Sequence, residues 1–290
     1  MSHHHDNHDT TQIDWDEMSG LLERNAQFQG PLYEQATAWL GELVPAAGVR
    51  RILDIGSGPG VMTLLFAEAF PYAEVVAVDA TEPLLERARA RAERAGLGDR
   101  VRTRHAELPD GIEELGEADL IWAGNSLHHI GDQRAALGGF ARLLRPGGLI
   151  AIAEGGLPMR HLPRDIGIGR PGLESRLDAA QSEWFNEMRA GLPGAKDEVE
   201  DWRALMGAAG LTPSGTRSFL LDIPAPAPEA VREHLVTGLA WQRKLLEGRL
   251  AAEDVAVLDR LLDPEDPQGL LHRPDAYFLT ARTVHTARRD

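Results

Sequence analysis

The chain has 290 residues, 43% of them hydrophobic, so it can bury a large core in one domain or in two modest ones. Its net charge of −15, from 45 acidic and 30 basic side chains, disfavours nucleic acid and anionic membranes as partners. The chain has no cysteine, which excludes disulfides, zinc–thiolate sites and cysteine nucleophiles. We expect a cytoplasmic protein, since no apolar run is long enough to span a membrane.

The first part of the chain predicts a tail followed by a helical lid. Residues 1–13 contain four histidines and few apolar side chains, which favours a disordered tail over a metal site. Residues 14–49 carry apolar side chains at helical spacing, and Tyr33 on this segment is a candidate to line a ligand pocket.

From residue 50 to residue 154, short apolar runs alternate with amphipathic segments. This alternation is typical of strands and helices around a mostly parallel sheet. We predict strands at 50–55, 74–78, 100–104, 118–124 and 149–154, and helices at 60–70, 82–95 and 133–144. Asp132 is the expected N-cap of the third of these helices.

After Glu154 the rhythm changes. We predict a cap insertion over 155–196, a continuation of the core over 197–223, a helical cap insertion over 224–274, and a last strand and tail over 275–290. The fold class is therefore α/β: a Rossmann-like, doubly wound, mostly parallel sheet of about seven strands with an antiparallel last strand. We expect the helical pieces together above the carboxyl edge of the strands, with Trp184 and Trp241 lining a substrate pocket; the alternative is that they cover the sheet faces.

The loop between the first strand and the first helix reads LDIGSGPG, residues 53–60. A glycine loop in this place serves NAD, FAD, nucleotide phosphates or S-adenosylmethionine. The dinucleotide pattern needs a glycine where Val61 stands, and a P-loop sequence is absent. Asp54 would repel a pyrophosphate and attract a cationic ligand, and Asp79 at the end of the second strand can accept both hydroxyls of a ribose.

Five motifs in this order resemble those of the class I S-adenosylmethionine-dependent methyltransferases, and more closely their small-molecule branch. They are LDIGSGPG, VVAVDA, RHAELPD, ADLIWAGNSLHHI and LLRPGGLIAIAE, and together they cover about residues 50–154. The resemblance implies S-adenosylmethionine as cofactor and S-adenosylhomocysteine as product.

The resemblance also implies which loops hold the cofactor. It places Asp54 near the amino group of the cofactor and Asp79 at the ribose. Because His105 stands where the family usually has an acid, we expect the adenine contact to come from a backbone group of Ala106 or from Glu107. The implied contact residues are Asp54, Gly56, Ser57, Gly58, Asp79, Ala80, Ala106, Glu107 and Asn125.

Methyl transfer from a sulfonium needs alignment, exclusion of water and, for some acceptors, a base. His128 and His129 follow the fourth strand, and either could be this base, since histidine titrates in the right range; the alternative is that one of them only orders the loop. Glu154 could bind a cationic substrate, act as the base, or be a structural carboxylate.

These observations predict a methyltransferase that acts on an oxygen, nitrogen or carbon atom of a small, partly apolar metabolite, as in small-molecule biosynthesis. One alternative is an enzyme that binds S-adenosylmethionine for other chemistry, and a less favoured one is an NAD-dependent oxidoreductase. We expect no metal, nucleic acid or membrane partner, and a homodimer is left open.

Overall fold

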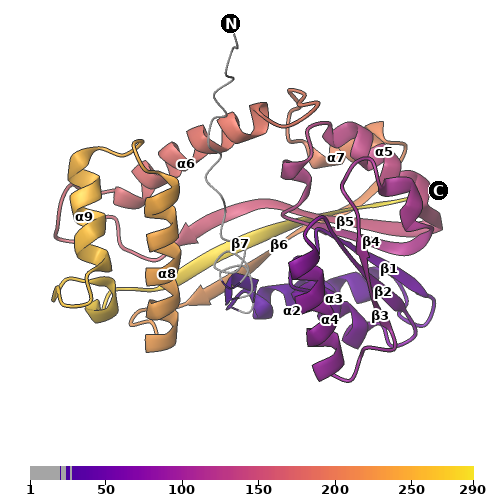
Figure 1. Ribbon diagram of the computed structural model, residues 1–290, viewed down its shortest axis with the longest axis horizontal. Helices are drawn as coiled ribbons and strands as arrows, with labels where there is room; N and C mark the ends of the chain where they lie inside the picture. Colours follow the sequence, from indigo (N-terminus) through magenta and orange to yellow (C-terminus); the bar gives the residue numbers. More distant parts are fainter. Residues whose placement is uncertain (1–19, 21–23, 27) are drawn as a thin grey trace, which may run out of the picture.

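The computed structural model describes residues 20, 24–26 and 28–290, so the predicted tail at 1–13 lies outside the described residues. The strands form one seven-stranded sheet in the order β3-β2-β1-β4-β5-β7-β6 (Figure 1). Strands β1 to β5 are parallel, whereas β7 runs antiparallel to both of its neighbours. The predicted fold class, with its antiparallel last strand, is therefore confirmed.

The strands are β1 (Arg51–Ile55), β2 (Glu74–Asp79), β3 (Val101–His105), β4 (Ala118–Gly124), β5 (Leu144–Arg160), β6 (Thr212–Ile223) and β7 (Phe278–Arg288). The helices are α2 (Gly30–Leu43), α3 (Val61–Ala69), α4 (Glu82–Arg94), α5 (Gln133–Leu143), α6 (Leu173–Ala190), α7 (Trp202–Ala208), α8 (Glu229–Leu245) and α9 (Ala252–Leu262), with short 3₁₀ turns η1 (Ile112–Leu115), η2 (Leu127–His129) and η3 (Leu270–His272). Asp132 caps α5 as predicted, because its Oδ1 accepts from the backbone N–H of Ala135 at 2.9 Å.

Strand β5 is much longer than its predicted range of 149–154. It begins at Leu144, which pairs with Ala118 of β4, and it continues to Arg160 because β7 pairs with it beyond the end of β4. Gly155 and Gly156 both have positive φ and take up the irregularity in this pairing. The first residues of the predicted cap insertion thus extend the sheet, and β5, β6 and β7 run together toward α8 and α9 (Figure 1).

The helices bury apolar side chains on both faces of the sheet. Leu32 of α2, Phe66 of α3 and Trp122 of β4 lie in one core cluster, and Phe140 of α5 and Met206 of α7 lie in the cluster on the other face. Helix α2 packs on α3, β6 and β7, so this helix covers a sheet face, as in the alternative arrangement. None of the described helices is long and apolar enough to cross a membrane.

The last glycine of the loop, Gly60, has a packing role. Its φ is +77°, and a Cβ there would lie 2.6 Å from the Cβ of Ala88 on α4. We expect Gly60→Ala to lower the free energy of unfolding by about 2–4 kcal/mol, through the left-handed backbone and the overpacking together. Gly96→Ala is the matched control, since Gly96 has a φ of +70° with no atom near its Cβ position. Equal losses in urea denaturation of the two variants would contradict the packing role.

Candidate active site

The glycine loop is tied to the end of β2. The backbone N–H groups of Gly56 and Ser57 both donate to the carbonyl of Val78, at 2.8 and 3.0 Å. A Cβ on Gly56 would lie 2.5 Å from the Cβ of Ser126, so this loop abuts the loop that follows β4. Gly58, with a φ of +53°, has no atom within 4 Å of its Cβ position, which leaves room for a ligand against its backbone.

Asp54, at the end of β1, is buried and has one side-chain donor. Its Oδ2 accepts from the Thr63 hydroxyl on α3 at 2.5 Å. Burial raises the pKa of Asp54 to about 7, the Thr63 hydrogen bond opposes this shift, and the charge of Asp79 adds to it. A carboxyl poised in this way favours a cationic ligand. Thr63 was not among the residues predicted from the sequence, where its signal is the single hydroxyl in the apolar run VMTLLF.

Asp79, at the end of β2, helps to shape the glycine loop. Its two carboxylate oxygens accept from the backbone N–H groups of Gly58 and Thr81, both at 2.9 Å. An ionised carboxylate has about four acceptor positions, so each oxygen can still accept a ligand hydroxyl.

The residues predicted to meet an adenine are joined to one another. His105 lies 2.9 Å, through Nε2, from the carbonyl oxygen of Ala80, and the backbone N–H of Ala106 donates to the carbonyl of Asp79 at 3.1 Å. Since the N–H of Ala106 is already engaged, its carbonyl and the exposed Glu107 are the groups left for such a contact.

Two hydroxyls at the loop have no partner. The Oγ atoms of Ser57 and Ser126 are buried and make no hydrogen bond within the described part of the chain. Buried polar atoms are normally satisfied, so these two are candidates to contact a polar ligand.

Asn125 connects β4 to the N-terminal helix. Its φ of +50° is unusual for a residue with a side chain, and its backbone N–H donates to the carbonyl of Ala153 at 3.0 Å. Its side-chain Nδ2 donates to the Tyr33 hydroxyl at 3.3 Å, and the Tyr33 ring meets Trp122 edge-on. The structure thus brings together Tyr33 and Asn125, which lie 92 residues apart in the chain.

Glu154 and His128 form a hydrogen-bonded pair at the carboxyl edge of the sheet. Glu154 is buried, and its Oε1 accepts from the backbone N–H of Leu127 at 3.0 Å. Its Oε2 lies 3.0 Å from Nδ1 of His128. Because a carboxylate can only accept a hydrogen bond, this contact favours a proton on Nδ1 and leaves Nε2 as the ring nitrogen that is not held by Glu154.

His129 differs from its neighbour. Its side chain is exposed and, among the described residues, makes no hydrogen bond with a carboxylate. Partial desolvation, with the neighbouring His128 as the second cause, lowers the pKa of His129 to about 4. His128, by contrast, is held on two sides, because the Phe185 ring lies 5.4 Å from its ring and Arg189 donates to its carbonyl at 2.8 Å. Arg189 also donates to the carbonyl of Ile130, and sequence reasoning gave no sign of this role.

Comparison with known proteins identifies the family. Residues 52–148 match the family model for a methyltransferase domain. The chain is 32% identical over 140 residues to 27-O-demethylrifamycin SV methyltransferase from Amycolatopsis mediterranei, an alignment that covers 48% of each chain. It is 30% identical over 202 residues to trans-aconitate 2-methyltransferase from Methylobacterium nodulans, covering 63% of this chain and 75% of that enzyme. The chain belongs to the class I S-adenosylmethionine-dependent methyltransferases.

A solved structure shares the fold of this methyltransferase. A protein from Bacillus halodurans C-125, provisionally assigned as a methyltransferase, superposes with a TM-score of 0.52 at 18% identity, covering 87% of this chain and 98% of that one. The chain matches only part of the length of several relatives. The alignment covers 29% of a Synechococcus protein and 48% of the rifamycin enzyme.

In the described part of the chain, neither of the two predicted pocket tryptophans makes a ring contact with a site residue. Trp184 is half-buried on α6 against the core cluster that contains Tyr33, and Trp241 is half-buried on α8. Gln242 Nε2 donates to Gln181 Oε1 at 2.7 Å, which joins these two helices. The aromatic side chain of α6 that meets the His128 ring is instead Phe185, at 5.4 Å, and the His129 ring lies 4.2 Å from the His128 ring.

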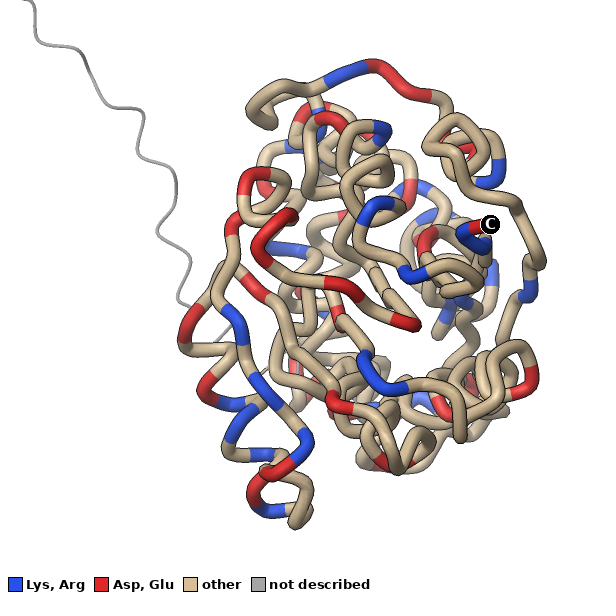
Figure 2. The backbone as a smooth tube through the Cα atoms, turned by 90° about the vertical axis from the view of Figure 1, so that its right-hand side faces the viewer, with Lys and Arg blue, Asp and Glu red and all other residues tan. Residues whose placement is uncertain are grey.

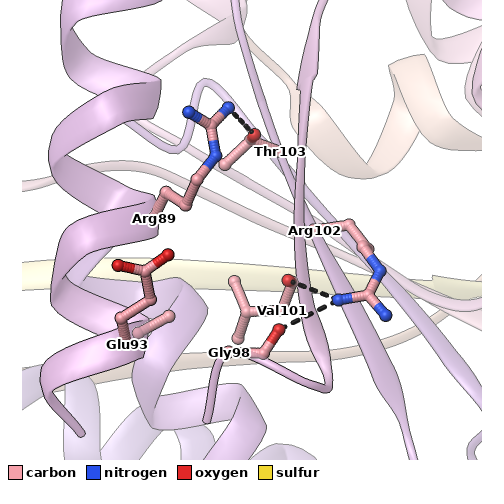
Figure 3. Close-up of a pocket in the computed structure, with 7 residues that line it drawn as sticks. Arg89, Glu93, Gly98, Val101, Arg102 and Thr103 are labelled. Atoms are coloured by element: carbon pink, nitrogen blue, oxygen red, sulfur yellow. Dashed lines mark hydrogen bonds between the residues drawn. The ribbon is translucent and has the colours of Figure 1, made fainter. Parts of the chain in front are cut away.

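A hollow of about 240 Å³ lies away from the glycine loop. It is lined by Arg89 and Glu93 of α4 and by Gly98, Val101 and Arg102 around the start of β3 (Figure 3). The start of a parallel strand is at the opposite edge of the sheet from the glycine loop. The arginines there are engaged by neighbouring groups of the chain, so this hollow is not a candidate active site.

Acidic and basic residues are interspersed along the backbone of the described chain (Figure 2). Within residues 20, 24–26 and 28–290, no group of three or more histidine and acidic side chains could hold a metal ion.

Proposed function

We propose that this methyltransferase transfers the methyl group of S-adenosylmethionine to an oxygen, nitrogen or carbon atom of a small, partly apolar metabolite. The observation that carries the proposal is the Glu154–His128 pair, which stands at the same edge of the sheet as Asp54 and Asp79. The names of two relatives point in the same direction, since a rifamycin and trans-aconitate are both small molecules.

The residues of the glycine loop fit S-adenosylmethionine. Asp54 would attract its ammonium group, Asp79 would accept its ribose hydroxyls, and the unpartnered Ser57 and Ser126 hydroxyls would meet its polar atoms. The bound cofactor supplies an electrophilic methyl group whose leaving group is a neutral thioether. Gly56, Gly58 and Asn125 would line its methionyl and ribose portion, and Ala80, Ala106 and Glu107 its adenine.

His128 is the proposed general base. Its Nδ1–H is held by Glu154, so Nε2 is left to take a proton from an O–H or N–H acceptor. The carboxylate then stabilises the imidazolium that forms, as in other carboxylate–histidine pairs. Glu154 is therefore a positioning residue in this proposal, and its own bond to the N–H of Leu127 fixes the loop that carries His128.

The proposal predicts a pH-dependent affinity for S-adenosylmethionine. The pKa of Asp54 is about 7 in the free protein, and its ionised form favours a cation, so affinity should rise as the pH rises. Between pH 6 and pH 8 we expect the association constant to increase about tenfold and then to level off. Calorimetric titration across this range measures it.

Two variants identify the group responsible. Asp54→Asn should bind more weakly at pH 8 and lose the dependence. Thr63→Val removes the hydroxyl that stabilises the carboxylate, and it should move the midpoint of the pH dependence upward. An unchanged pH profile in Asp54→Asn would assign the dependence to another group.

The transfer itself is tested with candidate acceptors. Mass spectrometry should detect S-adenosylhomocysteine and the methylated acceptor in equal amounts. Conversion of an acceptor without formation of S-adenosylhomocysteine would instead favour the alternative in which the cofactor is bound for other chemistry.

A further inference from the structure

Arg282, in the middle of β7, has no hydrogen-bond or ion-pair partner among the described residues. Its Nε is buried without a hydrogen bond, and no described residue forms an ion pair with its guanidinium. Other half-buried arginines donate to carboxylates or carbonyls: Arg160 to Asp178, Arg176 to Asp254, and Arg189 to the carbonyls of His128 and Ile130. A buried N–H group without an acceptor costs free energy, so the unpaired Nε of Arg282 requires a reason.

Strand register places Arg282 beyond the end of β4. Gly124, the last residue of β4, is level with Ala153 of β5, which is level with Val284 of β7. Arg282 lies two residues further toward the carboxyl end of β5, and two strand spacings put β7 about 10 Å from β4. Glu154, which holds His128, lies on β5 two residues before Gly156, the residue level with Arg282.

The side of the sheet is fixed by the residues opposite Arg282. In β6 its partner is Phe219, whose ring meets Trp39 of α2, so Arg282 shares the sheet face covered by α2. In β5 its partner is Gly156, which has no side chain. At this level of the sheet, β5 therefore places no side chain beside Arg282.

The carboxylates nearby are already engaged. Glu154 is held by Leu127 and His128, and it is not within ion-pair distance of Arg282. The neighbouring basic residue on this face, Arg217, differs from Arg282 because it is exposed and stacks over the Phe219 ring at 5.3 Å. Since no described carboxylate pairs with Arg282, an anion from outside the chain is the partner that this side chain can take.

We propose that Arg282 binds an anionic group of the methyl acceptor, a carboxylate or a phosphate. The planar guanidinium can hold such a group through two parallel N–H···O bonds. This inference rests on the proposed function and narrows its substrate to a metabolite that carries one negatively charged group and, for His128 to deprotonate, one O–H or N–H.

The experiment is a calorimetric titration of the full chain loaded with S-adenosylhomocysteine. The probes are benzoate, citrate and phenyl phosphate, with benzamide as the neutral match for benzoate. We expect millimolar or tighter binding of at least one anion and none of benzamide. Tighter binding of benzoate or citrate indicates a carboxylate site, whereas tighter binding of phenyl phosphate indicates a phosphate site.

Variants assign that binding to one side chain. Arg282→Gln should weaken the anion at least tenfold, Arg282→Lys should weaken it less, and Arg217→Gln is the matched control that should bind as the wild type does. Because Arg282 is unpaired in the free protein, Arg282→Gln should also keep or raise the melting temperature without anion, which shows that the variant folds.

The outcomes separate the two levels of the proposal. Two results overturn the inference about Arg282 when S-adenosylhomocysteine still binds. In one, the anions bind Arg282→Gln as tightly as the wild type; in the other, no anion binds to either protein. In both cases the proposed function stands. If S-adenosylhomocysteine itself does not bind, the proposed function fails, and the inference falls with it.

Discussion

His128→Gln is expected to lower kcat about 10²- to 10⁴-fold while changing the affinity for S-adenosylhomocysteine less than twofold. General-base catalysis contributes a factor of this size, and the loss should fall on kcat because the imidazole acts in the chemical step. The physical basis is the 3.0 Å contact between His128 Nδ1 and Glu154 Oε2, which leaves Nε2 as the proton acceptor. Steady-state kinetics and calorimetry measure the two quantities.

His129→Gln is the matched control. His129 is exposed and its pKa is lowered to about 4, so its removal should leave kcat within about threefold of wild type. Glu154→Gln keeps an acceptor for the N–H of Leu127 but removes the charge that stabilises the imidazolium, so it should shift the pH profile of kcat as well as lower kcat. Equal kcat values for the two histidine variants would contradict the assignment of His128 as the general base.

Asp79→Asn should weaken binding of S-adenosylhomocysteine by about 1.5–3 kcal/mol, the range for hydrogen bonds to a charged group. This corresponds to a dissociation constant about 10- to 150-fold higher. The structure adds a second reason to the ribose contact, because an amide nitrogen would replace one of the two oxygens that accept from Gly58 and Thr81.

Glu74→Gln, at the other end of the same strand, is the control for Asp79→Asn. Its carboxylate pairs with Arg51 and Arg102 at the surface, so its neutralisation should leave cofactor affinity unchanged. A wild-type dissociation constant in Asp79→Asn would eliminate the ribose assignment, whatever the activity of the variant.

Local sequence signals predicted the parts of this protein that depend on local physics. The apolar run RILDI and the loop LDIGSGPG gave β1 and the glycine loop, because a buried parallel strand and a tight turn each have a short sequence signature. Asp132 was predicted as a cap from its place before an amphipathic helix, and the hydrogen bond to Ala135 bears this out.

Contacts between distant residues could not be predicted in this way. The bond between Glu154 and His128 joins residues that lie 26 positions apart in the chain. It distinguishes His128 from the adjacent His129, whereas the sequence alone left the two histidines equivalent. The length of β5 depends on pairing with β7, more than 100 residues later, and the missing partner of Arg282 is a property of the folded surroundings. Each of these three features depends on how distant parts of the chain pack in the folded protein, so no local sequence motif predicts them.

The most direct test of the account is a calorimetric titration of the wild-type chain with S-adenosylmethionine and, separately, with NADH. The acid at Asp54 and the Val61 that interrupts the dinucleotide pattern predict that S-adenosylmethionine binds at one site per chain and that NADH gives no binding heat. Binding of NADH without binding of S-adenosylmethionine would contradict the account at its centre.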